Sequence, residues 1–198
     1  MEIAVLGWGS LIWCPGSLRI KTKWRSDGPA LPIEFARISR DGRLTLVIVP
    51  DSDDQRTYWA FSDFYTLEEA RDNLQEREGT SKLNIHYLDA AGRIAPGIPT
   101  PVLDRVREWL GARREVEAVV WTGLTTNWLE QRGHEFTTED AVRYLKQLEL
   151  EPDRSLVVHD RAREYVRNAP KLIQTVVRRA MQREGWQDNR LSTALFED

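Results

Sequence analysis

The chain has 198 residues, of which 41 % are hydrophobic and 30 % charged, and its formal net charge at pH 7 is −3. This length is enough for one sizeable domain with its own core, and the nearly balanced charge disfavours a general nucleic-acid binder, which needs a strongly basic surface. The single cysteine, Cys14, excludes an intrachain disulfide, and no apolar run approaches the roughly 18 residues expected of a membrane span.

Six short segments rich in β-branched and aromatic residues are typical of strands, and four of them come before residue 63. Two of the six flank Asp41–Gly42, which is a strong hairpin signal. The predicted strands cover residues 2–6, 31–39, 43–49, 57–62, 83–89 and 116–123.

Helix signals become frequent after the fourth strand. Residues 66–69 (TLEE) form a capping box that predicts a helix to about Arg77, with Gly79 as its stop. Further helices are expected to begin at Thr100, at Thr137 or Thr138, at Asp160 (a short one, through Tyr165) and at Pro170. In the helix from Thr100, the residues predicted to face the core are Val102, Val106, Trp109 and Leu110.

The order of these elements is mostly β in the first half of the chain and mostly α in the second. This favours an α+β fold over a regularly alternating α/β sheet. With no internal repeat or linker, we expect one domain over residues 1–198, of which about 186–198 form a loose tail. The N-terminal residues include Glu2 and show no basic segment followed by a long apolar one, so they do not read as a signal peptide. We therefore expect a cytoplasmic protein.

The segment GWGSLIW, residues 7–13, follows the first predicted strand and has two structural interpretations. It is neither a G-x-G-x-x-G nucleotide fingerprint nor a G-x-S-x-G nucleophile elbow. One interpretation is a tight turn whose Trp8 and Trp13 belong to the core. The other is a cradle, because glycines let backbone N–H groups approach a small anion without a clash from Cβ atoms.

The segment LQEREG, residues 74–79, places Glu76 and Glu78 at the predicted end of a helix. Helix C-termini favour cations, because the exposed carbonyl groups carry partial negative charge. A carboxyl group buried there would have a raised pKa, which suits a general base. The alternative is that both glutamates are solvated surface residues.

Other chemistry has less support. His86, His134 and His159 lie far apart without metal-ligand spacing, and no H-E-x-x-H motif is present, so no metal site is predicted. A hydrolase that uses Ser10 or Cys14 as nucleophile is an alternative, but the sequence assigns no base to either residue.

The segment GWGSLIW resembles the opening motif of the gamma-glutamylcyclotransferase superfamily, above all its ChaC-type, glutathione-degrading branch. That branch has G-Y-G-S-L-I-W after a short first strand, and only Trp8 differs here. The family's glutamate segment, L-x-x-R-E followed by a strand, is similar to Leu74–Glu78. Weaker similarity lies in Gly42–Leu46 and Tyr58–Phe61, so the resemblance covers about the first 90 residues.

This resemblance implies a small mixed or antiparallel, barrel-like sheet surrounded by helices. It implies a lyase-type enzyme that cyclises a small-molecule gamma-glutamyl amide, such as glutathione, to 5-oxoproline and releases an amine, without cofactor or metal. Glu78 would be the catalytic acid and base. The substrate-binding residues would be Trp8, Gly9, Ser10, Leu11 and, from a late helix, Tyr165. We expect neither nucleic acid nor a membrane as partner.

Two departures from the family pattern favour an alternative function. Trp8 lacks the hydroxyl of the family's tyrosine, and the family's G-G-Y after the glutamate is here Gly79–Lys82, without an aromatic residue. The alternative is therefore a non-catalytic module of the same fold that binds a gamma-glutamyl or amino-acid metabolite. The leaving group and the oligomeric state are left open by the sequence.

Overall fold

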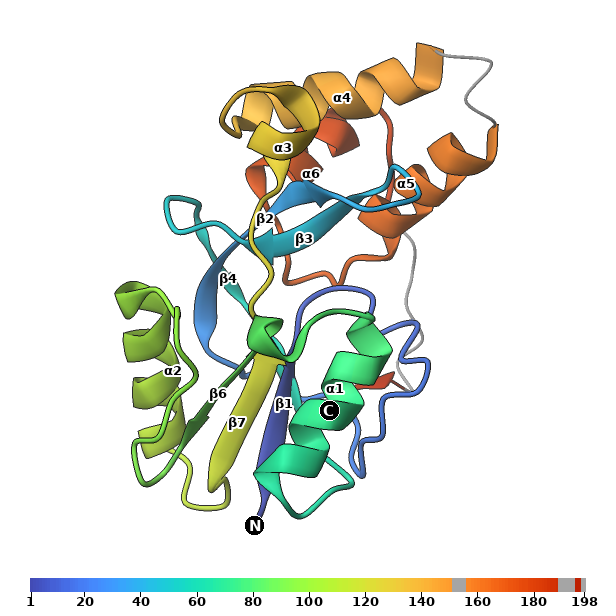
Figure 1. Ribbon diagram of the computed structural model, residues 1–198. Coiled ribbons are helices and arrows are strands. Elements are labelled where there is room, and N and C mark those ends of the chain that lie inside the picture. Colours follow the sequence, from blue (N-terminus) through green and yellow to red (C-terminus); the bar gives the residue numbers. More distant parts are fainter. Residues whose placement is uncertain (151–155, 189–194, 197–198) are drawn as a thin grey trace. The chain divides into compact units, whose positions relative to one another are not determined.

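The computed structural model (Figure 1) describes residues 1–150, 156–188 and 195–196. Where the sequence predicts one domain over residues 1–198, the backbone groups into two compact units. The first unit contains residues 1–31, 56–124 and the described part of 192–198, and the second contains 32–55 and the described part of 125–191. Each unit is described by itself.

The first unit is built on a mixed four-stranded sheet. Its strands are β1 (Ile3–Gly7), β5 (Tyr58–Phe61), β6 (Ile85–Asp89) and β7 (Ala118–Thr122), in the order β5-β1-β7-β6. β1 runs parallel to β7, and the other two pairs are antiparallel. Every residue of β1 and β5 is buried, which is why both strands are continuous apolar or aromatic runs without polar alternation.

Two helices and a short 3₁₀ turn complete the first unit. Helix α1 (Leu67–Glu78) contacts β6 and β7, and it ends at Gly79, which has the left-handed conformation (φ 59°) that glycine adopts without strain. The 3₁₀ turn η1 (Lys82–Asn84) leads into β6. Helix α2 (Thr100–Gly111) buries the four residues predicted to face the core. Both helices begin where the sequence signals place them.

The N-terminus of α1 gives a direct test of a predicted local signal. The Thr66 hydroxyl accepts a hydrogen bond from the Glu69 backbone N–H at 3.3 Å and donates one to the Glu69 carboxylate. We expect Thr66→Ala to lower the free energy of unfolding by about 1 kcal/mol, because an N-terminal donor of the helix loses its partner. Urea denaturation measures the change. Thr66→Ser, which keeps the hydroxyl, is the control and should stay close to wild type.

The second unit has a three-stranded sheet in the order β3-β2-β4. Its strands are β2 (Ala30–Ile38), β3 (Leu44–Ile48) and β4 (Asp54–Arg56), of which Ala30, Leu31 and Arg56 are counted with the first unit. β2 and β3 form the predicted antiparallel hairpin, with Gly42 at positive φ (79°) in its turn. The register shifts between Phe35 and Arg37, as at a β-bulge.

Four helices belong to the second unit. They are α3 (Trp128–Arg132), α4 (Thr138–Leu150), α5 (Leu156–Asn168) and α6 (Val176–Arg183). The predicted start of α4 is confirmed, and its cap is Thr137, whose hydroxyl accepts from the Asp140 N–H at 3.1 Å. In Figure 1 the helices of this unit gather around the β2–β3 hairpin.

The last helix begins later than predicted, at Val176 and not at Pro170. Thr175 caps it, and the buried Glu34 carboxylate accepts from the Val176 N–H at 3.0 Å. Burial raises the pKa of Glu34, while hydrogen bonds from Thr175 and from backbone N–H groups lower it, with a net rise. The helix start is therefore set by a residue 142 positions away, which no local pattern contains.

Other predictions of the fold need correction. The α+β class is confirmed, but in the described residues the strands form two open sheets and no closed barrel, because β5 and β6 end one sheet and β3 and β4 end the other. Asp160 lies inside α5 and does not cap it. β4 and α3 are too short to show a period, and the sequence does not predict them.

The expected tail, about 186–198, is described only in part. Trp186 is 1 % exposed and so belongs to the core of its unit. Phe196 forms a backbone bridge with Trp24, and its ring lies 5.3 Å from that of Tyr58. Residues 189–194 and 197–198 lie outside the described residues.

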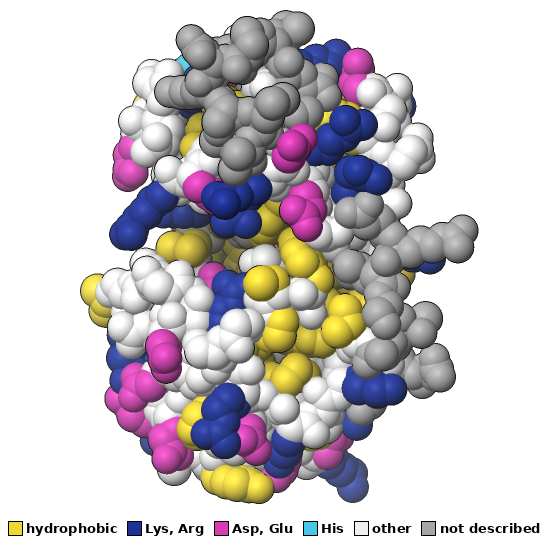
Figure 2. Space-filling view, turned by 90° about the vertical axis from the view of Figure 1, so that its right-hand side faces the viewer, with side chains coloured by type: hydrophobic (Ala, Val, Ile, Leu, Met, Phe, Trp, Pro, Cys, Tyr) yellow, Lys and Arg dark blue, Asp and Glu magenta, His cyan; other side chains and the backbone are white. Residues whose placement is uncertain are grey.

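The surface carries both signs of charge. On the face shown in Figure 2, basic and acidic side chains are interspersed and no extended basic field is visible. None of the helices in the described part of the chain is long and apolar enough to cross a membrane.

Candidate functional site

The loop after β1 is shaped by close packing against its neighbours. A Cβ atom at Gly7 would lie 2.8 Å from two ring atoms of the buried Trp24, so only glycine fits there. Beyond it, the chain folds into turns closed by the Ile12 N–H on the Gly9 carbonyl at 3.1 Å and by the Cys14 N–H on the Ser10 carbonyl at 2.8 Å. The first glycine of GWGSLIW thus has a structural explanation.

The tryptophans of this loop differ in their surroundings. Trp8 is 6 % exposed and belongs to the core of the first unit, whereas Trp13 is only half-buried. Leu11 and Ile12 are buried as well. The buried apolar side chains therefore anchor the loop, and most of its polar groups are backbone N–H and C=O groups.

Three backbone donors in this loop have no acceptor. The N–H groups of Gly9, Ser10 and Leu11 donate to no group among residues 1–150, 156–188 and 195–196. Gly9 and Leu11 are buried, and buried backbone N–H groups are almost always paired in folded proteins. Successive unpaired donors of this kind are suited to hold a small anion such as a carboxylate.

Arg77, near the end of α1, ties this loop to the helix. Its guanidinium donates to the Ser10 hydroxyl at 3.0 Å, to the Cys14 carbonyl at 2.7 Å and to the Pro15 carbonyl at 3.2 Å. It also pairs with the carboxylate of the neighbouring Glu78 at 3.2 Å. One half-buried side chain therefore holds both ends of the loop next to Glu78.

Glu78 is the last residue of α1, and its side chain is 17 % exposed. Burial raises the pKa of its carboxyl group, the Arg77 cation lowers it, and the net effect is a rise. Glu76, two residues earlier, is exposed. Of the two glutamates in the LQEREG segment, only Glu78 has the surroundings of a general base.

Tyr165, the fifth substrate-binding residue predicted, belongs to α5 in the second unit. It is 6 % exposed, and its ring lies edge-on to Phe35 at 6.2 Å, with the Arg43 guanidinium 5.6 Å away. The first unit thus brings Glu78 together with the loop of Trp8, Gly9, Ser10 and Leu11, while Tyr165 packs in the core of the other unit.

Among the described residues, no histidine forms a hydrogen bond with either alternative nucleophile. The Ser10 hydroxyl is bonded to Arg77, which is a donor and cannot act as a base, and Cys14 is exposed. His86 is 7 % exposed and packs on Gly123, where an added Cβ would lie 2.2 Å from the ring. Burial first, and then the Arg71 cation, lower its pKa.

In the described part of the chain, no group of three or more His, Cys, Asp or Glu side chains is arranged to hold a metal ion.

The sequence analysis does not predict that Arg77 binds the loop after β1, although the spacing of residues on α1 contains a signal for it. It lies four positions after Asn73 and three after Leu74, both of which are buried, so it shares their face of α1. Asn73 also binds a segment outside the helix: its side chain accepts a hydrogen bond from the Arg19 N–H and donates one to the Ser17 carbonyl, both at 2.9 Å. Two polar residues spaced by four on the buried face of a helix indicate a partner segment, which here is residues 14–19.

In comparisons with known proteins, no family model, no curated protein and no solved structure matches the chain.

Proposed function

We propose that this chain is a gamma-glutamylcyclotransferase-like enzyme that converts a gamma-glutamyl amide to 5-oxoproline and a free amine. The observation that carries the proposal is the link from Glu78 through Arg77 to Ser10. It joins a partly buried carboxyl group of raised pKa to a loop with three unpaired backbone donors. The resemblance of GWGSLIW and LQEREG to the family's two motifs supports the same assignment.

The proposed reaction needs only a base, an acid and a holder for the substrate. The α-amine of the glutamyl unit attacks its own γ-carbonyl carbon, forming the new C–N bond of the five-membered ring. Glu78 takes the proton from the attacking nitrogen and delivers it to the leaving nitrogen as the original C–N bond breaks. One carboxyl group of raised pKa can do both transfers in turn.

The loop would contribute binding and orientation. Its unpaired N–H groups would receive the substrate's α-carboxylate, and holding the glutamyl unit folded brings the amine within reach of the γ-carbonyl. Positioning of this kind supplies much of the advantage of an intramolecular reaction. No step uses a nucleophile of the protein, and we propose that the reaction takes place in the cytoplasm.

The second candidate is a non-catalytic module that binds a gamma-glutamyl or amino-acid metabolite. The specific observation in its favour is Trp8, which stands where the family has a tyrosine and is 6 % exposed, so it presents no hydroxyl and little surface to a ligand. The same loop donors would then hold the metabolite's carboxylate without turnover.

Release of 5-oxoproline from a panel of gamma-glutamyl compounds tests the proposal. The panel contains glutathione, a gamma-glutamyl amino acid and a gamma-glutamyl amine, and binding of each is measured in parallel by calorimetry. We expect release from at least one compound, and no loss of activity with a fluorophosphonate serine probe. Binding without release would establish the module instead, and activity abolished by the probe would favour a serine hydrolase.

A further inference from the structure

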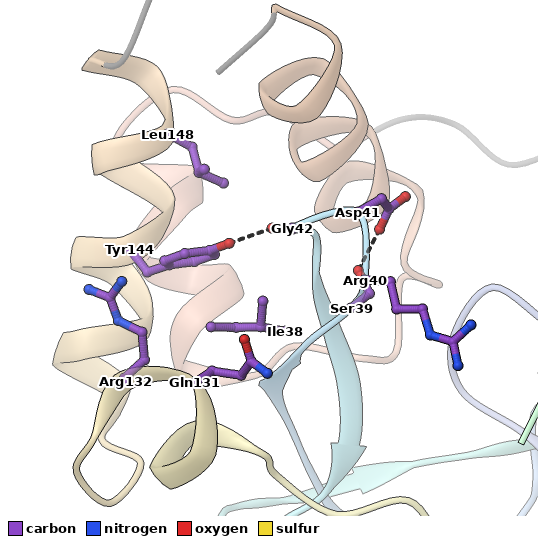
Figure 3. Close-up of a pocket in the computed structure, with 9 residues that line it drawn as sticks. All are labelled: Ile38, Ser39, Arg40, Asp41, Gly42, Gln131, Arg132, Tyr144 and Leu148. Carbon is purple, nitrogen blue, oxygen red and sulfur yellow. Dashed lines mark hydrogen bonds between the residues drawn. The ribbon is translucent and has the colours of Figure 1, made fainter. Parts of the chain in front are cut away.

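A pocket lies in the second unit, whereas the candidate site lies in the first. Its volume is about 440 Å³, within the range of small-molecule sites. Figure 3 shows its walls, which come from the end of β2 with the hairpin turn, from α3 and from α4. The pocket is lined by Ile38, the turn 39–42, Gln131, Arg132, Tyr144 and Leu148.

Tyr144 forms a rigid aromatic wall of this pocket. It is 6 % exposed, and its hydroxyl donates to the Gly42 carbonyl at 2.6 Å. Its ring also lies edge-on to the fully buried Trp128, with the centroids 6.0 Å apart. Ile38 and Leu148 extend the apolar surface beside it (Figure 3). A ligand would meet this surface already in place, without the entropic cost of ordering it.

The pocket's charge is positive. Its carboxylate, Asp41, accepts from the Ser39 hydroxyl at 2.6 Å and pairs with Arg43 at 2.8 Å, so its charge is already balanced. Arg132 makes no ion pair within residues 1–150, 156–188 and 195–196, and its guanidinium lies 5.5 Å from the centre of the Tyr144 ring. Arg40 extends away from Tyr144 in Figure 3 and is not part of this arrangement.

We propose that this pocket binds a small amphiphilic anion, a carboxylate with an aliphatic or aromatic body. The carboxylate pairs with Arg132, and the apolar body packs on Tyr144, Ile38 and Leu148. Arg132 is exposed and makes no ion pair with the described residues, so it can form a charge-assisted pair with a ligand without first breaking one of those. This site is independent of the proposed cyclotransferase activity.

Titration of the full chain by ¹⁵N NMR tests this site. The probes are 4-phenylbutyrate and the matched neutral 4-phenylbutyramide. We expect the carboxylate to shift signals of residues 38–42, 131–132, 144 and 148, and to bind about tenfold more tightly than the amide. Arg132→Gln should weaken carboxylate binding by a similar factor while leaving amide binding unchanged. Arg132→Lys should retain part of the preference.

The exposed Arg114 provides a matched control, because Arg114→Gln removes one arginine outside the pocket lining and should change neither affinity. Four results would overturn the proposal: no binding up to the probe's solubility, equal affinity for carboxylate and amide, equal affinity of Arg132→Gln and wild type, or shifts confined to other residues. Arg132 is exposed, so its variants are expected to fold, and the NMR spectrum without probe verifies this.

Discussion

Glu78→Gln is expected to lower kcat/KM for 5-oxoproline release by about 100-fold or more, because glutamine keeps the shape of the side chain but cannot carry a proton. The amide oxygen can still accept from Arg77, so the loop should stay in place. Substrate binding by calorimetry is expected to change much less than turnover. That difference separates a lost proton carrier from a damaged site.

Glu76→Gln is the matched control, since Glu76 is on the same last turn of α1 but exposed. It should retain activity close to wild type. Release that survives in Glu78→Gln and disappears in Glu76→Gln would show that the wrong glutamate has been assigned.

The stability of Glu78→Gln gives an independent check of the direction of the pKa shift. The folded-state pKa of Glu78 lies above its ordinary value, so its contribution to stability is fully present below the unfolded pKa and is lost as the pH rises through the folded pKa. Glutamine removes this loss. At neutral pH the variant should therefore be at least as stable as wild type, and the difference should shrink as the pH falls. Urea denaturation at several pH values measures it.

Arg77→Met is expected to lower kcat/KM by about tenfold to 100-fold, because the loop loses its three hydrogen bonds to α1 and the substrate is held less accurately. Removing the cation also removes the effect that lowers the pKa of Glu78. Since the base must be deprotonated, the acid limb of the pH profile of kcat/KM should move to higher pH. A purely structural role of Arg77 would lower activity without moving this limb.

Two further variants separate the two roles of Arg77. Arg77→Lys keeps the positive charge but loses the planar fork, so the acid limb should stay near its wild-type position while activity still falls. Arg71→Met is the control on the same helix, because Arg71 is similarly half-buried but acts on His86 and Tyr87. It should leave the limb unmoved. A limb that stays in place in Arg77→Met would contradict the electrostatic coupling between Arg77 and Glu78.

Much of the candidate site could be predicted from local sequence. The capping residue Thr66 and the stop at Gly79 define α1 to within one residue, and this makes Glu78 its last residue. The apolar run before Gly7 predicts a strand that is followed directly by the GWGSLIW loop. These signals work because caps, stops and hydrophobic runs act within a few residues of one another.

Other features depend on residues far apart in the chain. The hydrogen bond from Arg77 to Ser10 joins positions that are 67 residues apart in the sequence. The raised pKa of Glu78 results from burial of its carboxyl group, which depends on how the folded chain packs around it. The placement of Trp8 in the core likewise depends on which segments cover it, so the sequence alone could not choose between core and ligand contact. Desolvation and long-range pairing are properties of the packed chain.

The sequence by itself determined the six longer strands, the starts of α1, α2 and α4, the α+β class and the two motifs that carry the proposed chemistry, because each depends on neighbouring residues. Only the tertiary structure decided that the strands form two open sheets and that Arg77 connects Glu78 to the loop. It also decided that α6 begins at Val176, whose N–H donates to the buried Glu34 carboxylate. Segments that are distant in the sequence set the strand partners, the buried polar contacts and the shifted pKa values once they pack together. A local sequence pattern does not indicate which segments will pack together.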